Sequence, residues 1–397
     1  MHQNYMKLLK TIPNRLNLDH NANYLLACSF GPDSMALFNM LLTEKYNFSV
    51  AFVNYKTRSN SDYEEEELEK TCLKNNIAFH KKTYFIGNVS DFENVAREVR
   101  YSFFKDLAKE YSYNYLLTAH HADDSIETYL MHKKRHSLSK YEGIAGFSYS
   151  YDMYIKRPLL NCQKNSLLEY CKKNHVPYSI DYTNMDNVHL RNIIRHSIVE
   201  KMSYDEKQEI LDEINTKNKM LAKIYDKYKN YEVYSSVKRN LFINLGEYKS
   251  LHLLHFLIAK YTNSDFSGKY IKEMYNIILS NQKNKIYRLD QRFSLAIQYD
   301  DFMICETENL SKKISLNVDE AREKLGFDKK LLENAAKIVS LTNFSSFKMN
   351  GIIKNTKRFL IDCKIPITLR NLWPCVVDKD NNVIYVPRYR KNYRKKR

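Results

Sequence analysis

The feature that most constrains the fold is the regular alternation of short apolar runs with amphipathic helical segments through the first half of the chain. The apolar runs are nearly continuous, which is typical of strands buried on both faces of a sheet. The expected strands cover residues 24–29, 49–55, 79–85 and 115–120, and the expected helices cover 34–46, 61–75, 89–111 and 123–135. This order predicts an α/β fold with a doubly wound parallel sheet, whose ligands bind at the carboxyl ends of the strands.

The pattern changes after about residue 200. Residues 204–232 are charged and helical, and residues 287–305 have the pattern of two strands joined as a hairpin. A chain of 397 residues is also too long for one ordinary core. We therefore predict a catalytic α/β domain over residues 1–204, a mostly helical domain with a terminal hairpin over 205–310, and a small α+β domain over 330–397.

The charge of the chain favours a polyanionic partner. Sixty-three Lys and Arg residues against 46 Asp and Glu residues give a formal net charge of +17, a surplus that suits nucleic-acid binding. The last eleven residues, PRYRKNYRKKR, hold seven basic side chains and two tyrosines, which can contact phosphates and stack on bases. A lysine-rich amino-acid usage and a solvated tail are the alternative explanations.

Cysteine usage and hydropathy bear on the compartment. The seven cysteines are scattered and form no C-x-x-C pair, which fits a reducing cytoplasm and argues against a disulfide framework or a structural zinc site. The N-terminus lacks a signal-like apolar core, and no run of 18 apolar residues occurs. We therefore expect a cytoplasmic protein with no secretory signal and no contact with a membrane.

A short polar stretch ends the first expected strand and opens the first expected helix: Ser29, Phe30, Gly31, Pro32, Asp33 and Ser34. Backbone N–H groups at a helix N-terminus, together with serine hydroxyls, form an anion site that suits a nucleoside triphosphate. The sequence has no G-x-x-x-x-G-K-[ST], so this is not a Walker-type loop. An ordinary turn with Ser34 or Asp33 as helix cap is the alternative.

A second polar stretch, residues 118–128, follows the fourth expected strand, so the fold would bring it beside the first. Asp124 and Glu127 are three apart and share one helix face, and His120 lies at the strand end. Two acids and an imidazole beside a phosphate site could hold Mg²⁺ and act as a base. Helix capping by Asp123 and Asp124 is the alternative.

Two pairs of arginines complete the set. Arg97 and Arg100 are three apart on one expected helix, and Arg191 and Arg195 are four apart with apolar residues between them. Each pair could reach phosphates or RNA. Taken alone, each pair could equally lie on a solvated helix face.

Together these stretches resemble the bacterial tRNA(Ile)-lysidine synthases, which are N-type ATP pyrophosphatases with an adenine nucleotide α-hydrolase-like fold. The loop of that family is usually S-G-G-x-D-S, and four residues match it here: Ser29, Gly31, Asp33 and Ser34. The A-H-H-x-D-D-x-x-E-T motif matches at residues 119–128, A-R-x-x-R-Y at 96–101 and R-N-x-I-R-H at 191–196. The resemblance is strong over about residues 22–200 and weaker beyond.

The resemblance implies ATP and Mg²⁺ as cofactors, with a CAU-anticodon tRNA(Ile) and free L-lysine as substrates. ATP adenylates carbon 2 of the wobble cytidine and pyrophosphate leaves; the amine of lysine then displaces AMP and leaves lysidine. The modified base pairs with A rather than G, which gives the tRNA isoleucine identity. The resemblance also suggests a homodimer.

The residue types suit this chemistry. Mg²⁺ held by Asp33 and Asp124, the N–H groups of the loop and Arg100 would stabilise the departing pyrophosphate. An ammonium group cannot attack, so lysine must lose a proton. Asp124 is the expected base, with Glu127 and His120 orienting lysine or metal.

The binding residues that the resemblance implies include two departures from the family pattern. Arg191 and Arg195 would neutralise phosphate or the adenylate. Phe30 replaces the family's first glycine, and Pro32 removes one N–H donor from the loop. The phosphate cradle is therefore expected to differ in shape, although the whole loop is still the expected ATP site: Ser29, Phe30, Gly31, Pro32, Asp33 and Ser34.

Two other functions fit part of the same pattern. A tRNA thiolase of the same fold would share the loop but usually needs paired cysteines, and Cys162 and Cys171 are the only close pair here. A nucleotide-dependent RNA-binding protein without turnover is favoured by the glycine lost at Phe30. The retained Asp33 and Asp124 speak against the second function.

Overall fold

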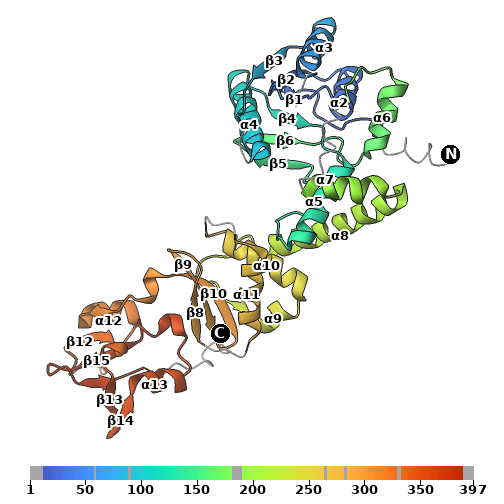
Figure 1. The fold of residues 1–397 in the computed structure, drawn as a ribbon. Coiled ribbons are helices and arrows are strands. Elements are labelled where there is room, and N and C mark those ends of the chain that lie inside the picture. The colour runs from blue at the N-terminus through green and yellow to red at the C-terminus, as the bar shows by residue number, and fades with distance from the viewer. Residues whose placement is uncertain are drawn as a thin grey trace. The chain divides into compact units, whose positions relative to one another are not determined.

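The structure is a computed structural model that describes residues 12–57, 60–87, 91–180, 190–262, 266–280, 284–328 and 332–387. The chain divides into two compact units, Met1–Met220 and Leu221–Arg397, which Figure 1 draws from blue to red along the chain. The finer three-domain division expected from the sequence stays a prediction. Among the described residues, no helix has the length and apolar character needed to cross a membrane.

The first unit is built on a six-stranded sheet with the order β3-β2-β1-β4-β6-β5. Every neighbouring pair is parallel except the edge pair β5–β6, which is antiparallel. The strands are β1 (Tyr24–Ala27), β2 (Phe48–Asn54), β3 (Phe79–Thr83), β4 (Tyr115–Thr118), β5 (Phe147–Ser150) and β6 (Met153–Lys156). The first four confirm the expected strands to within a few residues. Strands β1, β2 and β4 are apolar runs buried in the sheet, whereas the edge strand β3 (FHKKT) is only partly buried.

Helices cover both faces of this sheet, as the doubly wound prediction requires. They are α2 (Pro32–Thr43), α3 (Ser61–Lys74), α4 (Phe92–Glu110) and α6 (Lys164–Lys173), whereas α5 (Ala122–Arg135) and α7 (Leu190–Ser197) pack against each other in a separate cluster. Leu26 of β1 packs in one core with residues of α2, α3 and α6, whereas the adjacent Leu25 packs in a second core with residues of α4. Successive strand residues point to opposite faces, and Figure 1 shows α4 and α2 on opposite sides of the sheet.

The strand order reverses beside β1, and this reversal fixes the site. From β1 the chain builds outward through β2 and β3 on one side, then returns to place β4 on the other side of β1. The last residues of β1 and β4, Ala27 and Thr118, are register partners. The turns that follow these two strands therefore lie at a topological switch point, where open α/β sheets bind their ligands.

The helix α8 (Tyr204–Tyr228) crosses the boundary into the second unit, which contains α9 (Arg239–Ile243), α10 (Glu247–Ala259) and α11 (Gly268–Leu279). One sheet there has the order β7-β10-β9-β8, formed by β7 (Val237–Lys238), β8 (Lys285–Arg288), β9 (Phe293–Gln298) and β10 (Asp301–Glu306). The antiparallel pairing of Asp301 with Gln298 confirms the hairpin expected at residues 287–305.

A second sheet of this unit has the order β11-β12-β15-β16, and β13 and β14 form a separate hairpin. The strands are β11 (Ser315–Leu316), β12 (Lys337–Ser340), β13 (Ser346–Met349), β14 (Ile352–Asn355), β15 (Pro374–Val377) and β16 (Val383–Tyr385). The helices are α12 (Val318–Leu325) and α13 (Thr356–Asp362), with short 3-10 turns η3 (Glu308–Leu310), η5 (Leu341–Asn343) and η6 (Ile367–Leu369). The basic tail after Pro387 lies outside the described residues.

Candidate active site

A cavity of about 320 Å³ lies at the carboxyl ends of β1, β2 and β4. The central expectation of the sequence, that Asp33 and Asp124 share one cleft, is confirmed because both line this cavity. The other predicted site residues in its wall are Ser29, Gly31, Ser34, Arg100 and His120. The other predicted site residues do not line it: Phe30, Pro32, Glu127 and Arg191.

Hydrogen bonds of Ser34 to the backbone of Ser29 and Gly31 hold the loop after β1 in its conformation. Ser34 Oγ donates to the carbonyl of Gly31 at 3.0 Å and accepts from the N–H of Ser29 at 3.2 Å. Gly31 is the N-cap of α2 in an extended conformation, and no side chain caps the helix there. The first turn of α2 is therefore open toward the cavity, as an anion site requires.

Both departures from the family loop have a structural explanation. Phe30 has a φ of +59°, the left-handed region that glycine adopts readily and other residues adopt at a cost of about 1–2 kcal/mol. Its ring is buried in the core under the loop, which offsets that cost. Pro32 is the first residue of α2, where a helix leaves the N–H unpaired, so proline removes no helical hydrogen bond.

Asp33 carries an unused carboxylate oxygen. Its Oδ1 is buried and has no hydrogen-bond partner among the described residues, and its Oδ2 lies 3.6 Å from Nε2 of His121. Burial raises the pKa of Asp33 above its usual range, against the opposing pull of His121. A buried carboxylate with a free oxygen can take a cation or a proton from an incoming ligand.

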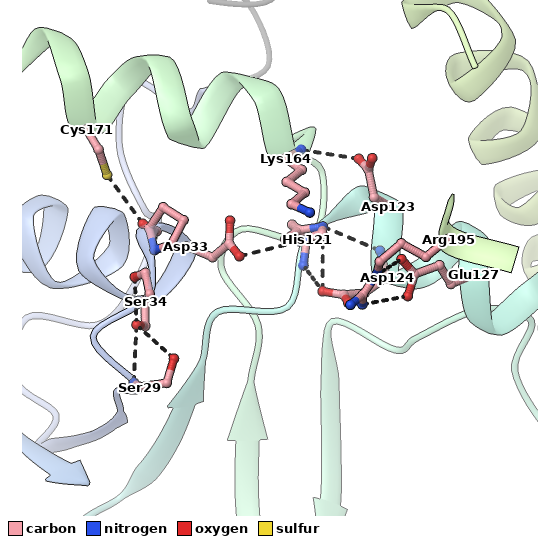
Figure 2. A network of polar contacts seen from close by, with 12 residues as sticks. Ser29, Asp33, Ser34, His121, Asp123, Asp124, Glu127, Lys164, Cys171 and Arg195 are labelled. Atoms are coloured by element: carbon pink, nitrogen blue, oxygen red, sulfur yellow. Dashed lines mark hydrogen bonds and ion pairs between the residues drawn. The ribbon is translucent and has the colours of Figure 1, made fainter. Parts of the chain in front are cut away.

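His121 joins the two acids and was not singled out from the sequence. Its ring lies between them, with Nδ1 3.5 Å from Oδ2 of Asp124 and Nε2 facing Asp33 (Figure 2). As N-cap of α5 it accepts from the N–H of Asp124, while Asp124 accepts from the N–H of His121 at 3.0 Å. This reciprocal pair of hydrogen bonds is a capping box. In the sequence, only the two adjacent histidines before the two aspartates could have indicated this role of His121.

Asp124 and Glu127 are held by the arginines of α7. Arg191 donates from Nη2 to Asp124 and from Nε to Glu127, both at 2.9 Å. Arg195 donates to both oxygens of Glu127, at 2.7 and 3.0 Å. Burial alone would raise the pKa of Asp124, but electrostatic interaction with His121 and Arg191 holds it well below the usual range. The predicted phosphate-binding arginines thus pair with the predicted acids, as Figure 2 shows for Arg195.

His120 lines the cavity beside Asp124. Burial is the main cause that lowers its pKa to about 4, and the positive charge of Arg157 and Arg191 adds to the effect. Its Nδ1 lies 2.8 Å from the hydroxyl of Thr118. The imidazole is therefore neutral near pH 7 and is a stronger proton acceptor than Asp124.

The opposite wall of the cavity comes from β2 and α4. Arg97 and Arg100 line it from α4, and the guanidinium of Arg97 lies 4.7 Å above the ring of Tyr101. Tyr55, at the end of β2, donates its hydroxyl to the carbonyl of Ala96 at 2.6 Å. Burial raises the pKa of Tyr55 to about 12 despite the opposing charge of Arg100. The hydroxyl therefore keeps its proton and stays a donor that connects the end of β2 to α4.

Asp123, the first acid of the pair, has a structural position. It accepts from the backbone N–H of Lys164 at 3.2 Å and forms a buried ion pair with Lys207 of α8. Both side chains of that pair are almost fully buried. Asp123 therefore does not cap α5 as the alternative reading expected; it attaches α5 to α6 and α8.

The donor set suits a magnesium ion only in part. No group of three or more His, Cys, Asp or Glu side chains among the described residues is arranged to hold a metal. Asp33 offers a free oxygen, but the ring of His121 lies between it and Asp124, whose oxygens are already paired. Mg²⁺ is commonly held by one or two carboxylates plus substrate phosphates and water, which fits Asp33 better than a joint site.

Comparison with known proteins identifies the class first. Residues 1–202, half of the chain, match a family model described as a PP-loop domain. A solved U34-tRNA thiolase, NcsA from Methanococcus maripaludis, shares 15% identity over 55% of this chain and 78% of its own, with a TM-score of 0.43. That structural likeness is too slight to bear on function.

The relatives in sequence are more specific. A tRNA(Ile)-lysidine synthase from Ureaplasma parvum is 31% identical over 79% of this chain and 96% of its own length. Another from Mycoplasma mycoides is 29% identical over 93% of this chain and 97% of its own. The chain belongs to the tRNA(Ile)-lysidine synthase family of PP-loop proteins.

Proposed function

We propose that this protein ligates L-lysine to carbon 2 of the wobble cytidine of a CAU-anticodon tRNA(Ile). ATP transfers its AMP group to the cytidine, which activates carbon 2, and pyrophosphate leaves; the lysine amine then attacks carbon 2, loses a proton, and AMP leaves. The single observation that carries the proposal is the meeting of the turns after β1 and β4 in one cavity, which brings Asp33 together with His120 and Asp124. The net charge of +17 suits the polyanionic substrate.

The loop and α4 would handle the phosphates. The open first turn of α2 and the hydroxyl of Ser29 offer donors to the triphosphate, while Ser34 holds the loop through the carbonyl of Gly31. Arg97 and Arg100 face the same cavity and would stabilise the charge that develops on the leaving pyrophosphate. Mg²⁺, held by Asp33 and by the phosphates themselves, would screen that charge as a Lewis acid.

The acids near α5 suit a positioning role better than the base role first expected for Asp124. A carboxylate whose pKa lies below the usual range and which accepts from Arg191 is a weak proton acceptor. His120 is neutral near pH 7 and lines the same cavity. We assign proton removal from the attacking amine to His120, and to Asp124 and Glu127 the attachment of α7 to the site through Arg191 and Arg195.

Cysteine burial argues against the thiolase alternative. Sulfur transfer requires a thiolate, and a buried thiol keeps its proton. Burial raises the pKa of Cys162 and of Cys171 to about 12, and that of Cys28, in the cavity wall, to about 11. The ligase reading needs no thiolate at all.

The test is nucleoside mass analysis of a CAU-anticodon transcript after incubation with ATP and labelled lysine. We expect labelled lysidine, together with AMP release that depends on lysine. A transcript with a different wobble base is the matched control and should give neither. A sulfur-containing nucleoside, or nucleotide binding without turnover, would contradict the proposal.

A further inference from the structure

The second unit contains a pocket of about 450 Å³ that the proposed chemistry does not use. Its wall is assembled from β8, η3, η5, α13 and η6, so it lies where several short elements of this unit meet. Apolar side chains such as Phe344, Leu360 and Ile367 form part of the wall. The volume is in the range of sites that bind small molecules or single residues of a larger ligand.

Three polar atoms in this wall are buried and unpaired. Thr342 Oγ1, Thr356 Oγ1 and Arg370 Nη2 have no hydrogen-bond partner in the part of the chain that the structure describes. Thr356 as a whole is only 4% exposed. Buried polar groups in folded proteins are nearly always paired, and three unpaired ones around one pocket indicate a polar group that binds there.

The unpaired atoms and the charge of the pocket select an anion. Arg370 and Lys357 line the pocket, and none of its lining residues is acidic. Nε of Arg370 donates to the carbonyl of Ile365 at 3.2 Å, which fixes the guanidinium while Nη2 stays unpaired. A guanidinium N–H beside two threonine hydroxyls matches the acceptor oxygens of a phosphate group.

The walls are held before any ligand arrives. The side chain of Asn355 caps α13, and the N–H of Thr356 donates to the carbonyl of Ser345 at 3.0 Å. Asn371 donates from its side chain to the carbonyl of Leu310 at 2.7 Å. These contacts hold the wall around Asn355, Thr356 and Asn371 in place, so little ordering of this part of the wall is needed on binding.

We propose that this pocket binds one nucleotide, with the phosphate at Arg370, Lys357 and the two threonine hydroxyls. The base would lie against the apolar wall, where Phe344 offers a ring for stacking. An unpaired nucleotide of the bound tRNA and a free nucleoside monophosphate present the same chemistry. The first source rests on the function proposed above, and the second does not.

The test uses Thr342→Val and Thr356→Val, which keep the side-chain shape and remove only an unpaired hydroxyl. Because no protein partner is lost, both variants should melt at the wild-type temperature or higher. If the pocket binds RNA, the Kd for the CAU-anticodon tRNA at fixed salt should rise about 3- to 10-fold for each variant. The KM for tRNA should rise with it, while kcat at saturating tRNA stays unchanged.

Thr368→Val is the matched control in the same unit. Its hydroxyl donates to Oε1 of Gln298 at 2.9 Å in a buried position. This variant should melt at a lower temperature and bind tRNA as the wild type does. The opposite pattern in the pocket variants and the control separates a ligand contact from a structural one.

A second arm titrates CMP and follows the melting temperature. Stabilisation of the wild type that Thr356→Val loses, with tRNA binding unchanged, would identify a free nucleotide as the occupant. Wild-type binding of both tRNA and CMP by the two pocket variants would overturn the inference. Lysidine formation is measured on the same wild-type preparation, so a failure of the proposed function is seen separately from a failure of the pocket.

Discussion

The turn after β1 and the start of α5 meet at one cavity, but their carboxylates differ in hydrogen-bond partners and in the direction of their pKa shifts. In the first, Asp33 keeps a buried oxygen without a partner, and burial raises its pKa. In the second, Asp124 and Glu127 are paired with the arginines of α7, and the pKa of Asp124 is held below its usual range. Asp33 therefore keeps an oxygen that is free to bind a ligand, whereas the carboxylate of Asp124 is already paired with an arginine.

This difference indicates which acid meets the ligand. A buried carboxylate that lacks a partner destabilises the folded state, whereas a paired one fixes the groups around it. Acids in one site whose pKa values are pushed apart commonly have different roles. We therefore expect Asp33 to act on the nucleotide and Asp124 with Glu127 to position the arginines.

The largest effect is expected for Asp33→Asn. Lysidine formation should fall about 10³-fold, because the carboxylate that would hold Mg²⁺ at the phosphates is lost. The free energy of unfolding should stay the same or rise by about 1 kcal/mol, because a disfavoured buried charge is removed. Nucleoside analysis and urea unfolding measure the two quantities. Asp152→Asn, which removes an exposed acid paired with Lys105, should change neither, and normal turnover by Asp33→Asn would break the comparison.

The next largest effect is expected for Glu127→Gln, and it concerns the free energy of unfolding. Glu127 is 1% exposed and accepts from Arg191 and Arg195, so removing its charge leaves two guanidinium groups poorly compensated. The free energy of unfolding should fall by about 3 kcal/mol in urea titrations. The control is Glu213→Gln, whose side chain is 43% exposed beside Lys217 and should cost less than about 1 kcal/mol. Equal losses at the two positions would mean that the cluster has no special structural role.

The free energy of unfolding should depend on pH in different ways for variants of Asp33 and Asp124. Each unit of pKa shift changes it by about 1 kcal/mol or more across the titration. The raised pKa of Asp33 makes its charged form unfavourable in the fold, so the advantage of Asp33→Asn over wild type should shrink as pH falls from neutral toward about 4. The lowered pKa of Asp124 gives stability that is present above its unfolded pKa. The deficit of Asp124→Asn should therefore stay constant down to about pH 4 and shrink only below it. Parallel pH curves for the two variants would contradict this.

The smallest effect concerns the backbone of the loop. Because Phe30 has a positive φ, Phe30→Gly should be more stable than Phe30→Ala by about 1 kcal/mol. At Phe38, a buried residue inside α2, the order should reverse by a similar amount, because glycine is a poor helix former. Urea unfolding of the four variants measures both differences. The same order at both positions would show that the left-handed backbone of the loop carries no strain.

The sequence predicted the sheet well where burial decides the pattern. Strands β1, β2 and β4 are buried apolar runs, whereas β3 (FHKKT) is a partly buried edge strand. The alternation of these strands with helices favoured parallel crossovers. The edge hairpin β5–β6 was not expected, because its strands are four residues long and expose Phe147, Tyr149 and Tyr154. In β6 the buried Met153 and Ile155 alternate with the exposed Tyr154, but a tyrosine at the exposed position conceals this period of two in a hydropathy pattern.

The sequence predicted where the site lies but not which side chains in it pair with one another. Topology alone brings Asp33 and Asp124 together, because both follow strands on either side of a switch point. The pairing of Glu127 with Arg191 and Arg195, 64 and 68 residues away, has no signature in local spacing. His121 was missed because adjacent histidines do not reveal which ring turns toward an acid.

The buried ring of Phe30 links the nucleotide loop mechanically to the core beneath it. The side chain belongs to the apolar cluster on one face of the sheet, while its backbone takes the left-handed conformation that leads into the first turn of α2. A change of packing in that cluster would therefore shift the backbone of the loop as well.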